Sequence, residues 1–94
     1  MFRVLTICMV IINISSAALH NAMIVADDVV VPIGTIDIHK EVAVEVPSKD
    51  SCRVIFTLKQ ESEEWLGTDN IKCDTLRISD QTEIFEIEVE KVAE

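Results

Sequence analysis

The chain has 94 residues, of which 49% are hydrophobic and 27% charged, and it contains only two glycines and two prolines. This length fits one small domain, and the composition excludes a disordered, collagen-like or linker-like chain. Eight basic residues against seventeen acidic ones give a net charge of −9. Such a charge repels a phosphate backbone and argues against nucleic-acid binding.

The N-terminus has the composition of a secretory signal peptide at residues 1–18. Arg3 supplies a positive start, an apolar run follows, and Ser16 and Ala18 are the small side chains that signal peptidase accepts. We therefore expect cleavage after Ala18 and a secreted mature domain of residues 19–94, with no stable membrane insertion. The alternative, an uncleaved signal-anchor protein with a β ectodomain, would need about 20 apolar residues, which is longer than this run.

Two cysteines, Cys52 and Cys73, lie in the expected mature domain, whereas Cys8 lies in the expected signal. An even number of cysteines in an oxidising compartment predicts one disulfide bond. In the chain-entropy model such a bond contributes about 3 kcal/mol, which matters for a domain with a small core. The alternatives are free thiols or part of a metal site, but a zinc site needs more Cys and His at short spacing.

The chain after residue 28 alternates apolar and polar residues, which indicates half-buried β-strands. Pro32 favours an edge position for the first of these strands, because proline cannot donate a ladder hydrogen bond. Pro47 ends a second run, and the run that begins at Cys52 is expected to be a central strand. Only residues 61–66 lean towards a helical turn. Further short strands are expected at residues 71–73, 76–79 and 85–89.

These six or seven short strands are separated by frequent turn signals. That pattern predicts an all-β fold, a small antiparallel β-sandwich or open barrel stapled by one disulfide.

The sequence shows no pattern typical of catalysis or metal binding. His39 falls at a strand end without a nucleophile motif nearby, and His20 lies beside the expected cleavage site. Asp69, Asn70 and Asp74 offer oxygen ligands but lack the spacing of a calcium-binding loop. We therefore expect no enzymatic activity, no cofactor and no metal.

The candidate binding residues are Trp65, Glu86, Glu88 and Glu90. Tryptophan is enriched at interface hot spots, although packing against the core near the disulfide is the more common role for a single tryptophan. Alternate glutamates share one face of a strand, where like charges favour water or a basic partner.

The sequence thus favours a secreted, acidic binding protein that acts as an effector or inhibitor on an extracellular protein partner with a basic surface. A small secreted carrier of an apolar ligand is the alternative, for which a chain of this size has room only for a small cavity.

Overall fold

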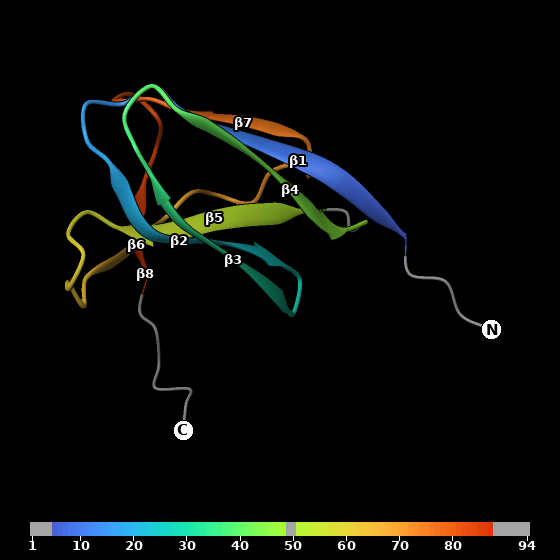
Figure 1. Ribbon diagram of the computed structural model, residues 1–94. Coiled ribbons are helices and arrows are strands. Elements are labelled where there is room, and N and C mark those ends of the chain that lie inside the picture. Colours follow the sequence, from blue (N-terminus) through green and yellow to red (C-terminus); the bar gives the residue numbers. More distant parts are fainter. Residues whose placement is uncertain (1–4, 49–50, 88–94) are drawn as a thin grey trace.

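A computed structural model of the protein describes residues 5–48 and 51–87, which contain strands and turns but no helix (Figure 1). The all-β class and the disulfide are as predicted. Seven of the eight strands lie in residues 19–87, in agreement with the predicted six or seven, and the eighth, β1, lies in the expected signal. Their bounds are β1 Thr6–Asn13, β2 Leu19–Ala26, β3 Val29–Ile36, β4 Glu41–Pro47, β5 Cys52–Thr57, β6 Trp65–Gly67, β7 Thr75–Ile78 and β8 Phe85–Ile87.

Five strands form one sheet in the order β3-β2-β5-β6-β8, with every neighbouring pair antiparallel. Strands β2 and β3 are joined by a two-residue turn, in which Asp27 takes the left-handed φ of 58°. Such a turn matches the twist of a β-hairpin, and an aspartate tolerates the left-handed conformation. As predicted, the strand that contains Pro32 lies at the sheet edge and β5 lies in the interior.

The other sheet has three strands in the order β4-β1-β7. Strand β1 pairs antiparallel with β4 from Thr6↔Pro47 to Ile12↔Glu41 and parallel with β7 from Val10↔Thr75 to Asn13↔Ile78. The segment with signal-peptide composition is therefore the middle strand when it is part of the folded chain. The parallel pair is also a departure from the predicted antiparallel arrangement.

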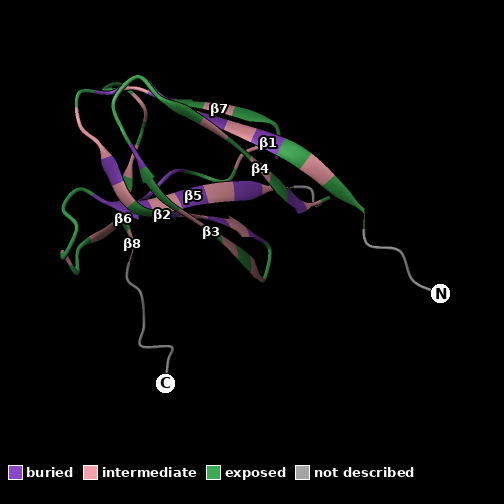
Figure 2. Ribbon diagram, in the orientation of Figure 1, coloured by how far each residue is buried: buried purple, intermediate pink, exposed green. Residues whose placement is uncertain are grey.

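The two sheets pack face to face, with the three-stranded sheet lying across the five-stranded one (Figure 1). Buried residues recur at alternate positions of β1 and β5, as Figure 2 shows. Met9 and Ile11 of β1 are fully buried, as are Ile24 of β2 and Val54 of β5, and Phe56 is 2% exposed. These side chains belong to one hydrophobic core shared by both sheets.

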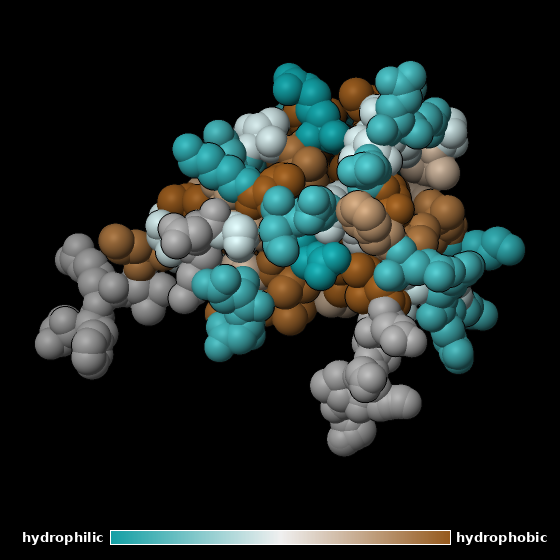
Figure 3. Space-filling view, turned by 180° about the vertical axis from the view of Figure 1, so that it is seen from behind, coloured by the Kyte–Doolittle hydropathy of each residue, from teal (hydrophilic) through white to brown (hydrophobic). Residues whose placement is uncertain are grey.

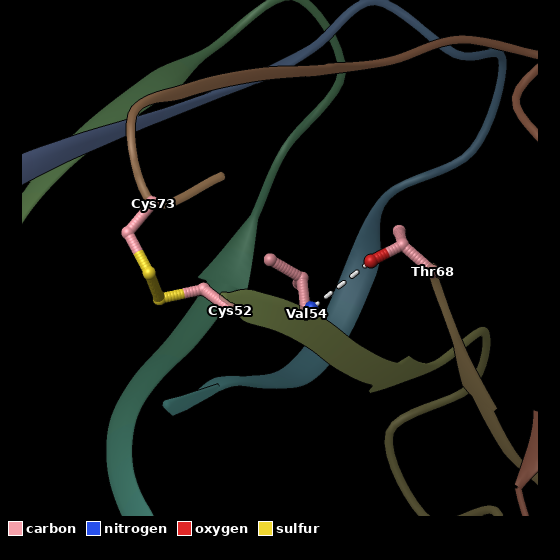
Figure 4. The surroundings of a disulfide bond; sticks show 4 residues. All are labelled: Cys52, Val54, Thr68 and Cys73. Atoms are coloured by element: carbon pink, nitrogen blue, oxygen red, sulfur yellow. Dashed lines mark hydrogen bonds between the residues drawn. A yellow bond between two sulfur atoms is a disulfide. The ribbon is translucent and has the colours of Figure 1, made fainter. Parts of the chain in front are cut away.

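The disulfide bond between Cys52 and Cys73 is present, with the two Cα atoms 5.2 Å apart (Figure 4). Cys52 is the first residue of β5, and Cys73 lies two residues before β7. The bond therefore connects one sheet to the segment that enters the other. Beside it, the Val54 amide donates a hydrogen bond of 3.1 Å to the hydroxyl of buried Thr68 (Figure 4).

Three local predictions were wrong or incomplete. Residues 61–66 are not helical, because Trp65 and Leu66 belong to β6. Residues 71–73 form only an isolated bridge, between Ile71 and Cys52. Strand β2 was not expected as a separate strand; its pairing is interrupted by a register shift around Asn21, which has a left-handed φ of 55°.

Candidate functional site

The last strand of the five-stranded sheet and its neighbour form the walls of an acidic pocket. Strands β6 and β8 pair so that Trp65 is opposite Ile87 and Leu66 is opposite Glu86. The pocket has a volume of about 370 Å³ and is lined by Glu63, Glu64, Trp65, Glu86 and Ile87.

A turn before β6 presents the first two glutamates of the pocket. The Ser62 amide donates to the Lys59 carbonyl at 3.3 Å, and the Ser62 hydroxyl accepts a 2.9 Å hydrogen bond from the Glu64 amide. A serine that bonds to the backbone two residues ahead fixes the chain direction locally. Glu63 and Glu64 consequently remain exposed, while Trp65 is half-buried.

Gly67 explains how the strands that carry the pocket pack closely. It pairs with Ile55 on one side and with Phe85 on the other. A Cβ atom at this position would lie 2.9 Å from Cδ1 of Ile87 and 3.0 Å from Cγ2 of Ile55. The absence of a side chain therefore leaves the space that Ile87, one wall of the pocket, occupies.

The pocket combines one indole with three carboxylates, and none of its lining residues is basic. The face of an indole ring carries negative electrostatic potential and attracts a cation, as do carboxylates. The arrangement is therefore suited to a cationic group that has an apolar stem, such as a lysine or arginine side chain, because Ile87 provides an apolar contact.

Two of the four predicted binding residues, Trp65 and Glu86, thus lie at one site. Glu88 and Glu90 lie outside the described residues, so the predicted ladder of glutamates is described only at Glu86. The site also includes residues that the sequence analysis did not select, namely Glu63, Glu64 and Ile87. The two glutamates directly before Trp65 were a usable signal for part of it.

A second cavity of about 290 Å³ opens at one end of the space between the two sheets. Its rim is held by Asp80, whose Oδ1 accepts hydrogen bonds from the Ser16 amide at 2.8 Å and from the Ser16 hydroxyl at 3.0 Å. The lining is mainly apolar and consists of Ser15, Ser16, Ala17, Leu19, Phe56, Leu58, Leu66, Ile78, Ser79, Asp80, Thr82 and Ile84.

The histidines occupy separate places in the fold. His20 lies in β2, with Nδ1 3.5 Å from the hydroxyl of Thr35. His39 lies in the turn between β3 and β4, with a left-handed φ of 64°. In residues 5–48 and 51–87 no group of three or more His, Cys, Asp or Glu side chains is placed to hold a metal ion.

The outer surface mixes polar and apolar residues. Seen from behind, hydrophilic and hydrophobic residues alternate over the visible face (Figure 3). The most exposed large apolar side chains, Leu5, Val30 and Leu58, come from three different parts of the chain. Among the residues that the structure describes, no helix is long and apolar enough to cross a bilayer.

Comparisons with known proteins give no relative. The chain matches no protein-family model, no curated protein and no solved structure at a significant level. Function must therefore be argued from the site itself.

Proposed function

We propose that this chain is an extracellular, disulfide-stabilised binding domain, and that the pocket around Trp65 holds a cationic side chain of a protein partner. The observation that carries the proposal is the pocket itself, in which one indole and three carboxylates share a volume of about 370 Å³. The disulfide supports an extracellular location, because such bonds persist in oxidising compartments. The signal-peptide composition of residues 1–18 supports it as well.

The size of the pocket favours a single side chain as its occupant. Sites for small ligands in proteins span about 300 to 1,000 Å³, so this pocket is at the lower end of that range. A cation above an indole contributes about 0.5 to 2 kcal/mol, depending on how far it is desolvated. The net charge of −9 further accelerates the approach of a basic partner, in a salt-dependent way.

An array of synthetic peptides tests this function. Each peptide carries one arginine, and its counterpart carries citrulline, which has nearly the same shape but no charge. We expect the protein to bind arginine peptides at least about tenfold more tightly than their citrulline counterparts, and to lose this preference when Trp65 is changed to Ala. Because Trp65 is the only tryptophan, its fluorescence reports occupancy of the pocket directly.

A pair of charge-matched variants separates the pocket from general acidity. The pocket variant combines Glu63→Gln, Glu64→Gln and Glu86→Gln. The control combines Glu41→Gln, Glu45→Gln and Asp74→Asn, which removes the same charge from exposed positions near or in the three-stranded sheet. Equal losses of peptide binding in both variants would show that no specific pocket is involved.

A second candidate function, the binding of a small apolar ligand, is favoured by the cavity of about 290 Å³ at the end of the sandwich. Ser15, Ser16 and Ala17 form part of its lining, so this candidate applies to a chain that keeps these residues. Native mass spectrometry of the purified protein checks it: a co-purified small molecule supports it, and a bare mass with no uptake of added fatty acid contradicts it.

A further inference from the structure

We propose that, after cleavage at Ala18, the domain accepts an extended strand of its partner between β4 and β7, in the place that β1 occupies in the intact chain. The proposal rests on the proposed function, because it requires both export with cleavage and a protein partner. It adds a second contact with that partner, on the opposite sheet from the pocket around Trp65.

In residues 5–48 and 51–87, β1 is the only strand that links β4 and β7 within their sheet. On one side it pairs with β4 over residues 6–12, and on the other with β7 over residues 10–13. Removal of residues 1–18 therefore leaves two facing strand edges with unpaired backbone groups. Unpaired edges are templates for an added strand, and main-chain hydrogen bonds supply much of the affinity in that mode of recognition.

Both strands that flank this place remain attached to the other sheet. The disulfide holds the start of β7 to β5, since Cys73 lies two residues before β7. Strand β4 follows β3 through a short turn, in which the Lys40 amide donates to the Asp37 carbonyl at 3.2 Å. Cleavage thus removes the middle strand but neither of the two connections.

The surface of the five-stranded sheet that β1 covers is apolar, so it is favourable for another strand to bury it. Met9 and Ile11 are both fully buried and belong to the same core as Ile24, Val54 and Phe56 of the five-stranded sheet. Loss of β1 removes Met9 and Ile11 and exposes the side chains of the five-stranded sheet that they cover. An incoming strand must therefore bring large apolar side chains two residues apart, as β1 does.

Asn13 specifies a further requirement at the end of the strand. Its fully buried side chain donates through Nδ2 to the carbonyls of Ile36 at 3.0 Å and Asp37 at 3.2 Å. Its backbone carbonyl accepts from the His39 amide at 2.7 Å. Ile36, Asp37 and His39 remain after cleavage, whereas the Ala17 carbonyl and the Ser15 amide, which also bond to the Asn13 side chain, are removed. We infer that the partner segment ends with an asparagine or another amide donor two residues after its second apolar side chain, and runs antiparallel to β4.

The test uses the oxidised chain of residues 19–94 and a synthetic peptide of residues 5–14 as the probe. The peptide carries Cys8→Ser so that it cannot exchange with the disulfide. We expect saturable binding, together with at least about tenfold slower amide exchange in β4 and β7 of the bound protein. If the chain of residues 19–94 does not fold alone, refolding in the presence of the peptide is measured instead, and rescue is expected.

Two further peptides make the result specific, each with one added carboxylate. Thr6→Asp places it at an exposed position and should leave binding nearly unchanged, whereas Ile11→Asp places it in the core and should weaken binding about a hundredfold. Equal effects of both changes would overturn the proposal. Failure of the parent peptide to bind or rescue, or full amide protection in β4 and β7 without peptide, would also overturn it.

The mass of the protein exported by expressing cells gives an independent check, since an exported chain that retains residues 6–13 excludes a partner strand at this place. The proposed function is tested by a separate measurement. Arginine peptides report on Trp65 through its fluorescence, and none of the residues that line that pocket belongs to β1, β4 or β7, so the two tests are read out at different places in the folded protein.

Discussion

The two sheets of this protein are assembled in different ways. The five-stranded sheet consists only of antiparallel neighbours, several of them close in the chain, such as β2 and β3 across a two-residue turn. The three-stranded sheet combines strands from the beginning, middle and end of the described chain, including one parallel pair. The first sheet therefore includes two locally connected pairs, β2–β3 and β5–β6, whereas the second has none and depends on a single middle strand.

This difference predicts how stability is distributed. Contacts distant in sequence require the chain to close long loops before the contacts form. The three-stranded sheet should therefore open more easily than the five-stranded sheet when β1 is weakened, and the disulfide should oppose that opening because it ties the entry of β7 to β5. The following experiments test that comparison, from the largest expected effect to the smallest.

Truncation of a buried side chain in β1 should have the largest effect. Ile11 is fully buried, so Ile11→Ala in the full chain should reduce the free energy of unfolding by about 2 to 5 kcal/mol, through lost burial and a residual cavity. The control Val30→Ala, at a position 51% exposed in β3, should change it by less than about 0.5 kcal/mol. Urea unfolding measures both, and similar losses in the two variants would contradict the role of β1 in the core.

Loss of the disulfide should have the next largest effect. The bond closes a loop with a sequence separation of 21, and the variant with both Cys52→Ala and Cys73→Ala should lose about 3 kcal/mol. Amide exchange should accelerate more in β7 than in β3, because β7 loses its covalent tie to the other sheet. An equal increase in both strands would mean that the bond does not selectively hold the three-stranded sheet.

Removal of the buried amide at Asn13 should cost less. The Asn13→Ala variant leaves the Ser15 amide and the Ile36 and Asp37 carbonyls without the hydrogen-bond partner that they have here. Unsatisfied buried polar groups predict a loss of about 1 to 3 kcal/mol. Asn70→Ala, at an exposed loop position, is the control and should be nearly neutral in thermal unfolding. Neutral behaviour of both variants would mean that the buried amide is not a stabilising link.

The smallest effect is expected in the five-stranded sheet at Gly34. Its φ of +107° is unfavourable for other residues, while no atom lies within 4 Å of an added Cβ. Gly34→Ala should therefore cost about 1 to 2 kcal/mol from backbone strain alone. By contrast, the cost of Gly67→Ala arises from contact with both Ile87 and Ile55, so shortening one of these side chains with Ile87→Ala should relieve it in part. If Ile87→Ala also relieved the cost of Gly34→Ala, the distinction between backbone strain at Gly34 and side-chain contact at Gly67 would be refuted. Thermal unfolding of the three single and two double variants provides the comparison.

The sequence by itself determined the all-β class, the disulfide and the existence of strands at β3, β4, β5, β7 and β8. Alternating side chains indicate strands because successive residues point to opposite faces, and Pro32 limits its strand to an edge. The pair Cys52 and Cys73 followed from the count of cysteines expected outside the signal. These features depend on local stereochemistry or on residue type, and both can be read without knowing the partners in space.

Tertiary structure alone decided the place of residues 6–13 and the composition of the acidic pocket. A short continuous apolar run has the same appearance whether it becomes a signal peptide or a strand buried in a core, because periodicity does not distinguish them. Trp65 and Glu86 lie in the same pocket because β7 joins the other sheet, so that β6 and β8 become neighbours. Pairing between distant strands is a collective result of core packing, and no local pattern in the chain encodes it.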